Sequence, residues 1–496
     1  MATGIALDGT QDVKNPHALF SVGVTILAVV GLSLMANAAG LSLAAVVTVD
    51  PTKEVGAVKL MNAVNNGPVI ARSDQSRGNF ADFKALRVPY ARTHDSINQA
   101  TSNGHTVDIS AVFPDFEADE NDPANYDFAY TDAFLENIIA AGTKPFFRLG
   151  QTIENGIKKY HVFPPKDFAK WARVCEHVIL HCNEGWCNGH RWGIEYWEIW
   201  NEADAQPDEK RGESCQWQGT KAEFFEFYET VAKHLKGKFP NLKIGGPSLG
   251  FRMDWAKEFV KWQSERGTPI DFFSWHCYAR GFTWLKAQAR EVRQLLDANG
   301  YSGAESILDE WNYIKNWTTD FPYSVRVISS NVGGAFTAAY MCESQKLPID
   351  MLMYYDARPA TVYNGLFDFY TFAPLPGYYA LFSWADLRDL GTQVAADAAA
   401  SSHNDKAVIT AVAAKGADDS LGVLVVRYCD DRNITASETF TLRLASGRFT
   451  GRVRGYVTDA DRLHSPAHLV PKDDGTVSFA LAPNAFIYIE THFSNQ

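Results

Sequence analysis

Short apolar, β-prone runs alternate with longer amphipathic stretches from about residue 59 onward. This alternation predicts a parallel sheet whose strands are connected by helices. The candidate strands are Leu60–Asn66, Tyr90–His94, Pro145–Leu149, Tyr196–Trp200, Leu242–Gly246, Phe272–Cys277, Ser306–Glu310 and Met351–Tyr355. The candidate helices include Tyr130–Ala141, Pro165–Cys182, Lys221–Lys236, Trp284–Ala298 and Gly377–Leu390. This number of strand–helix units is typical of a closed (β/α)₈ barrel, with an open doubly wound sheet as the alternative.

The pattern changes after about residue 393. An Ala-rich stretch at Val394–Ala400 is interpreted as a link, and short alternating runs follow it. These runs predict strands at Leu421–Tyr428, Glu438–Leu444, Thr450–Val457 and Ala485–Glu490. Turn residues separate them and no helix is evident, which favours an antiparallel β-sandwich. The predicted fold class is therefore α/β, a TIM barrel followed by a C-terminal antiparallel β-sandwich.

The N-terminal part of the chain carries an uncharged, largely apolar stretch. Its most hydrophobic part, Leu19–Met35, precedes Ala36-Asn37-Ala38, which matches the small-residue pattern of a signal-peptide cleavage site. We expect residues 1–39 to be a signal peptide, with an uncleaved membrane anchor as the alternative. The first case predicts a secreted or periplasmic protein, and the second predicts a membrane-anchored one.

A chain of 496 residues is too long for a single compact core. A barrel of about 250–350 residues with a smaller second domain accounts for this length. The predicted segments are the signal peptide or anchor in residues 1–39, an N-terminal β segment in 40–58 that can join the sandwich, the barrel in 59–392, and the sandwich in 393–496.

Charge and composition narrow the classes of partner. The net charge is −12 and no dense run of Lys or Arg occurs, so no nucleic-acid partner is expected. The 13 Trp and 20 Tyr are mostly core residues, but aromatic rings beside polar groups also suit a sugar, whose C–H faces stack on them. Nothing in the pattern indicates an oligomeric state.

Cysteine and histidine spacing gives little sign of a metal. The seven cysteines leave at least one free thiol, and Cys182 and Cys187 flank a turn across which they could form a disulfide. There is no C-x-x-C pair. His177 and His181 stand four residues apart on a predicted helix, but they lack the glutamate that a catalytic H-E-x-x-H helix carries. We expect neither a metal nor another cofactor.

Polar residues gather where the predicted barrel strands end, and barrel enzymes carry their chemistry at that edge. Glu202 follows the fourth strand in the run Tyr196-Trp197-Glu198-Ile199-Trp200-Asn201-Glu202, and Glu310 closes the seventh strand. Glycoside hydrolysis needs one carboxylic acid to protonate the leaving oxygen and one carboxylate to attack the anomeric carbon or activate a water. Two glutamates facing each other across a barrel can supply that pair.

Further motifs strengthen this interpretation. Asn201-Glu202 and Leu308-Asp309-Glu310-Trp311-Asn312 resemble the signature of retaining barrel glycosidases with glutamates at strands four and seven. The segments that narrow the resemblance are Tyr90-Ala91-Arg92-Thr93-His94-Asp95, Gly245-Gly246-Pro247-Ser248 and Ser274-Trp275-His276-Cys277-Tyr278. Together they resemble glycoside hydrolase family 39, which contains β-xylosidases and α-L-iduronidases. The resemblance covers about residues 55–390, and Ala203 departs from the Pro that the family often has after its glutamate.

The resemblance implies a role for each residue. Glu202 is the acid/base and Glu310 is the nucleophile, kept ionised by donors such as Arg92 and Tyr278. Asn201 is expected to bond the sugar 2-hydroxyl. The substrate-binding residues expected are Asn201, His94, His276, Tyr278, Arg92 and Asp356. Two alternatives stay open, because Arg92 can be a purely structural ion-pair partner and Asp356 can pair with Arg358.

Strand alternation makes a prediction about two further acidic residues. Asp309 precedes Glu310 directly and is expected to point away from the pocket. Glu198 shares the parity of Glu202 and is expected deeper in the barrel, where it needs a basic partner.

These features predict an exo-acting β-xylosidase that works with retention on xylan fragments. Another sugar, such as an α-L-iduronide or an arabinoside, is the alternative within the class, and a carboxylated sugar would need a cation such as Arg358. A catalytically silent sugar-binding protein would be expected to lack one of the glutamates. A metal-dependent barrel hydrolase would need a His-x-His at the first strand, where the chain has Asn62-Ala63-Val64.

Overall fold

The computed structural model describes residues 45–71, 73, 76–94, 106–152, 162–205, 216–250, 252–399 and 407–494. The predicted signal peptide or membrane anchor, residues 1–39, lies outside this part of the chain. Among the residues described, we find no helix with both the length and the apolar character that crossing a membrane requires.

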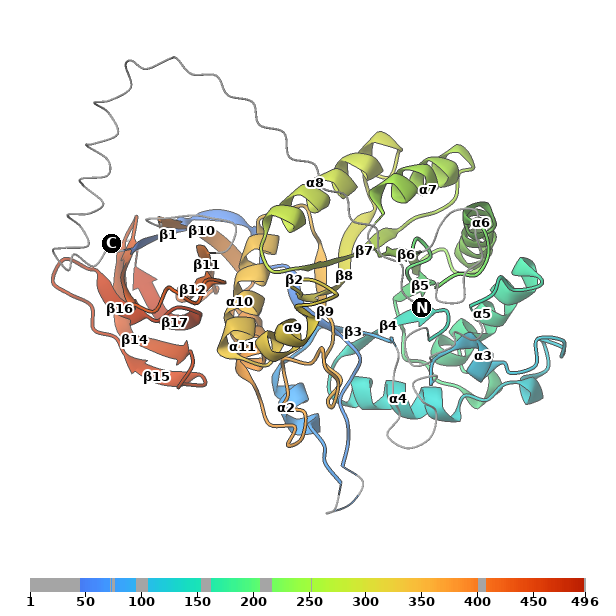
Figure 1. The fold of residues 1–496 in the computed structure, drawn as a ribbon, viewed down its shortest axis with the longest axis horizontal. Helices are drawn as coiled ribbons and strands as arrows, with labels where there is room; N and C mark the ends of the chain where they lie inside the picture. Colours follow the sequence, from blue (N-terminus) through green and yellow to red (C-terminus); the bar gives the residue numbers. More distant parts are fainter. Residues whose placement is uncertain are drawn as a thin grey trace, which may run out of the picture. The chain divides into compact units, whose positions relative to one another are not determined.

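A closed barrel of parallel strands forms the larger part of the structure (Figure 1). Its strands, in order around the barrel, are β2 (Leu60–Asn65), β3 (Tyr90–Arg92), β4 (Lys144–Leu149), β5 (Tyr196–Ile199), β6 (Lys243–Leu249), β7 (Phe272–Ala279), β8 (Glu305–Tyr313) and β9 (Met351–Tyr354). The longer helices are α4 (Ala129–Ala140), α5 (Phe168–Asn183), α6 (Lys221–Lys238), α7 (Met253–Glu265), α8 (Thr283–Ala298), α10 (Asn331–Gln345) and α11 (Pro376–Leu390). The shorter ones are α2 (Phe80–Ala85), α3 (Ile109–Val112) and α9 (Phe321–Ile328). The predicted barrel is confirmed.

Helix α6 illustrates how local sequence sets an element of the barrel wall. The Thr220 hydroxyl accepts from the Glu223 N–H at 3.2 Å, and the Glu223 carboxylate accepts from the Thr220 N–H at 2.7 Å. This reciprocal pair is a capping box, which satisfies two N–H groups at the start of the helix. Phe224, Phe227 and Val231 recur at helical spacing and are buried against the barrel. The helix packs against β5, the strand that precedes Glu202, and against β6, the strand that contains Ser248.

An apolar layer closes the N-terminal half of the barrel. It contains side chains near the starts of the strands, namely Ala63, Tyr90, Phe146, Tyr196, Phe272, Ile307, Met351 and Met353. Phe146 and Tyr196 stack with their ring centroids 5.0 Å apart. This layer excludes water from below the polar residues at the strand ends, so charges there interact through a medium of low polarity.

The C-terminal region is a single nine-stranded sheet around its own core. In spatial order the strands are β15 (Ser465–His468), β14 (Arg448–Thr458), β17 (Ala485–Ser494), β12 (Ser420–Cys429), β11 (Ala407–Lys415), β10 (Thr392–Ala399), β1 (Ala45–Ala57), β13 (Glu438–Leu444) and β16 (Val477–Leu481). The sheet is mixed where a purely antiparallel one was expected, because β1 pairs with β13 in parallel.

One feature of this sheet differs from the sequence interpretation, and a second, the N-terminal β segment that was expected to join the sheet, agrees with it. The Ala-rich stretch expected to be a link is β10, which pairs antiparallel with β1 and β11. Small side chains on both faces of a strand hide the alternation on which a strand prediction rests. The N-terminal β segment, β1, lies between β10 and β13, so the strand that precedes the barrel in sequence is central to the sheet that follows it.

The turn after α5 keeps two cysteines apart. Cys182 is buried at the end of α5, and the Sγ of Cys187 faces the carbonyl of Pro123 at 3.6 Å. Both thiols are free, so the disulfide considered from their spacing is not formed.

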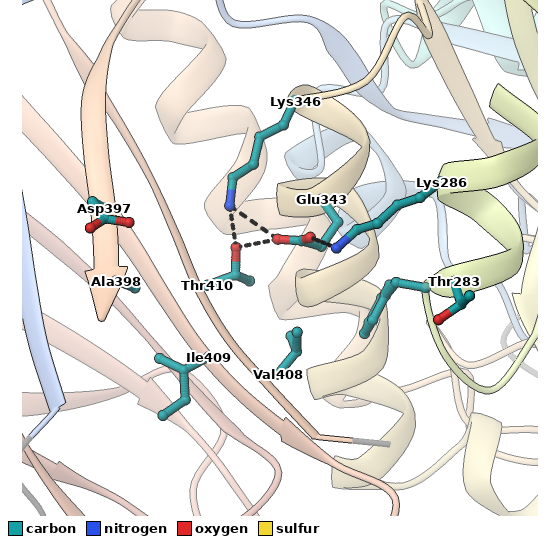
Figure 2. A pocket seen from close by; sticks show the side chains of 10 residues that line it. Thr283, Lys286, Glu343, Lys346, Asp397, Ala398, Val408, Ile409 and Thr410 are labelled. Atoms are coloured by element: carbon teal, nitrogen blue, oxygen red, sulfur yellow. Dashed lines mark hydrogen bonds and ion pairs between the residues drawn. The ribbon is translucent and has the colours of Figure 1, made fainter. Parts of the chain in front are cut away.

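Glu343 on α10 links the barrel helices to the sheet (Figure 2). Its carboxylate accepts from the Thr410 hydroxyl of β11 at 2.7 Å and pairs with Lys286 of α8 at 2.6 Å and with Lys346 at 3.0 Å. Burial raises the pKa of Glu343, but the Lys346 charge and these hydrogen bonds outweigh burial and lower the pKa to about 2. The folded state is therefore stabilised by the ionised form of this carboxyl group.

We predict that Glu343→Gln lowers the free energy of unfolding by about 2 kcal/mol at pH 7. The lowered pKa means that this stabilisation is complete above pH 4.5, the ordinary value, and is lost as the pH falls through about 2. The difference between wild type and variant should therefore vanish in that window when urea unfolding is followed at several pH values.

Glu258→Gln is the control, because Glu258 is exposed and pairs with a single lysine, Lys221. It should change stability by less than about 1 kcal/mol at any pH. Equal effects of the two substitutions at pH 7 would contradict the assignment.

Candidate active site

A buried arginine organises the C-terminal end of the barrel. Arg92 ends β3, and its side chain is fully buried. Its five N–H groups reach acceptors between 2.6 and 3.0 Å away on Glu198, Asn65, Glu310, Asn201 and Ser248. A guanidinium has five N–H donors, so all of them are used by protein acceptors. Arg92 was expected to bind substrate or to be a structural ion-pair partner, and these contacts are those of an ion-pair partner.

Glu310 lies on β8 at the centre of this network. Tyr278 donates its hydroxyl to one carboxylate oxygen at 2.9 Å, while Arg92 and the Nε2 of His94 contact the other at 2.8 and 2.9 Å. Burial raises the pKa of Glu310, but the positive fields of His276, His94 and Arg92 outweigh burial and hold that pKa well below its usual range. The carboxylate is ionised and held in a fixed orientation, as a nucleophile requires.

Glu202 follows β5 on a turn with left-handed backbone, φ +47°, and its N–H donates to the Ser248 carbonyl at 2.9 Å. One oxygen of Glu202 and one of Glu310 lie within 4.8 Å of each other. The two environments differ, because the Glu202 side chain is 23% exposed and that of Glu310 is 3% exposed. The pair thus combines a buried, ionised carboxylate with a carboxyl group open to solvent.

His276 lies between the two glutamates. Its Nδ1 is 2.8 Å from Glu202, and its Nε2 is 2.7 Å from the Ser248 hydroxyl and 3.4 Å from Glu310. Burial lowers the pKa of His276, but Glu310 and Asp309 outweigh burial and raise that pKa well above its usual value. The ring is therefore cationic, and it lies beside both carboxyl groups: one ligand atom each of Glu202, His276 and Glu310 lies within 4.8 Å of the other two.

The neighbouring acids show one correct expectation and one wrong one. Glu198 is fully buried against Arg92 Nε at 2.6 Å, as its parity predicted. Asp309 was expected to point away, but it contacts Arg92 Nε at 3.3 Å and the Ser248 hydroxyl at 2.7 Å. The cause is a β-bulge, since Trp275 pairs with Leu308 and His276 pairs with Glu310, leaving Asp309 without a partner on β7.

Protonation balances the surplus of buried acids. Burial raises the pKa of Glu198 to about 7, with Arg92 opposing the shift and Asp309 adding to it. The pKa of Asp309 shifts in the opposite direction: burial raises it, but Arg92 and His276 outweigh burial and lower it. The interior charges near neutral pH are therefore Arg92 and His276 against Asp309 and Glu310, with Glu198 partly protonated.

Asn201 and Asp356 have distinct surroundings. The Asn201 side-chain oxygen accepts from Arg92 and lies 2.8 Å from the Ser248 hydroxyl, while its Nδ2 has no acceptor among the described residues. That N–H₂ group is available to a substrate hydroxyl. Asp356 is buried and pairs with Arg358 at 3.0 Å, so the mutual salt bridge is present. Burial raises the pKa of Asp356, and the charge of Arg358 opposes that shift.

Sequence reasoning missed the contribution of Ser248. Its hydroxyl lies within 2.9 Å of Arg92, Asn201, His276 and Asp309, at a residue with φ +56°. The run Gly245-Gly246-Pro247-Ser248 marked the position without indicating a role. Among the tryptophans near strand ends, Trp275 and Trp311 are fully buried. Trp317 is 55% exposed and meets the Tyr278 ring edge-on at 5.1 Å.

Sequence comparisons identify similar proteins for part of the chain. Residues 61–303 match the sequence profile described as Glycosyl hydrolases family 39. A β-xylosidase of Geobacillus stearothermophilus is 30% identical over 190 residues, which is 36% of this chain and 35% of that protein. A β-xylosidase of Caldicellulosiruptor saccharolyticus is 26% identical over 203 residues, 39% of this chain and 37% of that protein. The match thus spans about a third of the length of these curated relatives.

Solved structures share the fold. A glucosidase from Croceicoccus marinus superposes with a TM-score of 0.73 at 21% identity, covering 91% of this chain and 99% of that one. A GH39 enzyme from Xanthomonas axonopodis pv. citri gives 0.64 at 15% identity, covering 91% and 98%.

We predict that Tyr278→Phe lowers kcat about 10- to 100-fold while leaving the fold intact, because it removes one donor to Glu310 and little volume. Steady-state kinetics on an aryl glycoside measure the loss. Tyr340→Phe is the matched control. The Tyr340 hydroxyl, on helix α10, donates to the backbone carbonyl of Cys277, the neighbour of Tyr278 in β7, at 3.3 Å and not to Glu310. A similar kcat loss in both variants would indicate a structural effect and contradict the role given to Tyr278.

Proposed function

The chain carries a glycoside hydrolase family 39 domain, and on this premise we propose that it is a retaining glycosidase with Glu202 as acid/base and Glu310 as nucleophile. The observation that carries the proposal is the approach of the two carboxyl groups to within 4.8 Å in unequal environments. Retaining glycosidases hold their carboxyl groups about 5–5.5 Å apart, which leaves no room for a water between one of them and the sugar.

In the first step, Glu310 attacks the anomeric carbon as the bond to the leaving oxygen breaks. Glu202 gives its proton to that oxygen, so the aglycone departs as an alcohol and the sugar remains as an ester of Glu310. In the second step, the ionised Glu202 takes a proton from water, and the hydroxide attacks the same carbon and releases Glu310. Arg92, His94 and Tyr278 hold Glu310 in its ionised form at the start and the end of this cycle.

The charge of His276 fits both steps. Its Nδ1 faces the Glu202 carboxyl group at 2.8 Å. A donor there stabilises Glu202 when it becomes a carboxylate after giving up its proton. Both ring nitrogens face protein groups, so His276 acts as a positioning residue between Glu202 on one side and Ser248 and Asp309 on the other.

We propose a β-xyloside, cleaved from a chain end, as the substrate. The names of the two curated relatives support this choice, and their identity to the chain is confined to about a third of their length. The pairing of Arg358 with Asp356 argues against an α-L-iduronide, whose carboxylate would need an available cation. Both glutamates are present and close, which argues against a silent sugar-binding protein. Secretion, proposed from the N-terminal apolar segment, would bring the enzyme to such a substrate.

The product should first appear with the anomeric configuration of the substrate, because two displacements at one carbon restore it. Proton NMR of the first minutes of hydrolysis, before mutarotation, measures this. Early appearance of the opposite anomer would mean a single displacement by water and a different pair of residues.

The two glutamates should fail differently when each is replaced by alanine. Glu202→Ala should still form the glycosyl-enzyme from a dinitrophenyl glycoside, whose leaving group needs no proton, and then stall for want of a base. Azide, which needs no base, should restore turnover and give a glycosyl azide of retained configuration. Glu310→Ala should instead give the inverted azide, because azide then enters from the vacated face.

The results for these two variants test which glutamate is the acid/base and which is the nucleophile. If Glu202→Ala loses activity equally on activated and unactivated substrates and azide restores nothing, the acid/base lies elsewhere. A panel of aryl glycosides that differ only in the sugar determines the substrate.

A further inference from the structure

A cluster of two histidines and one aspartate lies outside the active site, on the outer wall of the barrel. His181 is in the last turn of α5, His190 follows the short helix η2 (Trp186–Asn188), and Asp132 is in the first turn of α4. The Nε2 of His181 is 2.9 Å from one Asp132 oxygen, and the Nε2 of His190 is 3.2 Å from the other. Three potential ligand atoms therefore converge from three elements.

Hydrogen bonding fixes the tautomer of His181. Its Nδ1 is 3.0 Å from the carbonyl oxygen of Trp186, and a carbonyl only accepts, so the proton is on Nδ1. In the neutral ring, Nε2 then presents a lone pair to the Asp132 carboxylate, which is also a lone-pair donor. A metal-bound histidine typically donates its other N–H to a backbone carbonyl in this way.

His190 contributes a second, similar group. Its Nε2 is buried and makes no hydrogen bond of acceptable geometry among the described residues, although the Asp132 oxygen is 3.2 Å away. One carboxylate thus faces two ring nitrogens. The two ring nitrogens approach the two oxygens of this carboxylate separately, at 2.9 and 3.2 Å. A divalent cation bound by all three side chains satisfies both nitrogens and the carboxylate.

The rings are held in place before any ligand binds. His181 stacks on Phe128 with centroids 3.5 Å apart, and His190 stacks on Trp192 at 3.7 Å. The backbone of Gly189 passes so close to His181 that a Cβ there would lie 2.2 Å from the His181 carbonyl oxygen and 2.7 Å from its Nδ1. Glycine at 189 is therefore what allows the loop to bring His190 beside His181.

We propose that Asp132, His181 and His190 form a zinc site that fastens the loop after α5 to α4. Two imidazoles and a carboxylate are ordinary zinc ligands, with bonds of about 2.0–2.1 Å and a tetrahedral arrangement. Ligand atoms in that arrangement are about 3.3 Å apart. Each ring nitrogen lies 2.9 or 3.2 Å from an Asp132 oxygen, and the three ligand atoms lie within 4.8 Å of one another. Asp132 and His190 are about a quarter exposed, so water can complete the coordination. The loop leads into β5, the strand that precedes Asn201 and Glu202.

Residue spacing along the chain indicated only one of the three ligands. It drew attention to His177 and His181, but the Nδ1 of His177 bonds the Arg173 carbonyl at 2.9 Å and its ring packs on Trp186. The second histidine ligand, His190, lies nine residues after His181, beyond a turn in which Cys187 and Asn188 have left-handed backbone conformations. This site is independent of the proposed glycosidase mechanism.

The test uses the full chain, stripped of metal with a chelator and titrated with Zn²⁺ alone. We expect one zinc per chain by elemental analysis and a rise of several degrees in the unfolding temperature. Co²⁺ should give the intense visible absorption of a tetrahedral complex. Asp132→Asn and His190→Gln should weaken zinc binding at least tenfold, whereas His177→Gln, the matched control on the same helix, should bind as the wild type does.

Several outcomes would overturn the proposal. The first is that Zn²⁺ does not change the unfolding temperature of the wild type, and the second is that the wild type and the two ligand variants bind zinc equally well. The third is that Glu202→Gln loses zinc binding while His190→Gln keeps it, which would assign the zinc to the active site. If a ligand variant does not fold, as judged by circular dichroism, the wild-type Co²⁺ spectrum decides, and its absence refutes the site. Hydrolysis in chelator well below the unfolding temperature should persist.

Discussion

The contact of one buried guanidinium with three buried carboxyl groups sets the arrangement of this barrel mouth. Arg92 reaches Glu198, Asp309 and Glu310 from the end of a three-residue strand, and none of these side chains is more than 3% exposed. A carboxylate cannot be buried without compensation, and one arginine compensates only part of this charge. His276 supplies a second cation and Glu198 retains a proton for part of the time, so the cluster approaches neutrality.

This constraint explains why the environments of the two glutamates differ, although Glu202 follows β5 and Glu310 lies in β8 at the same edge of the barrel. Glu310 lies among the cations and is surrounded by donors, whereas Glu202 is partly open to solvent and faces His276. The apolar layer beneath, with Phe146 and Tyr196 at its centre, keeps water from screening these interactions. The same interior that stabilises the charges therefore gives the two carboxyl groups separate chemical properties.

Strand-period patterns were enough to predict every barrel strand and to place Glu202 and Glu310 at the same edge of the barrel, because a barrel repeats one unit and places its polar residues at one edge. The features that were missed depend on contacts between distant segments. The bulge that turns Asp309 inward exists only in the pairing of β7 with β8. Strand β10 is recognisable by its partners and not by its small side chains, and Ser248 gains its role from four residues on other elements. His190 approaches His181 only because Gly189 permits a close turn.

The most direct test of the account is to trap the covalent intermediate and find where it is attached. A 2-deoxy-2-fluoro aryl glycoside of the preferred sugar forms the glycosyl-enzyme quickly and hydrolyses slowly, because the fluorine destabilises both transition states while the activated leaving group restores the first step. Mass spectrometry of the intact protein should show one sugar per chain, and peptide mapping should place it on Glu310. A label on Glu198, Asp309 or Glu202, or turnover with no covalent adduct, would contradict the central claim. That claim is that Arg92 and the groups around it keep Glu310 ionised and oriented as the nucleophile.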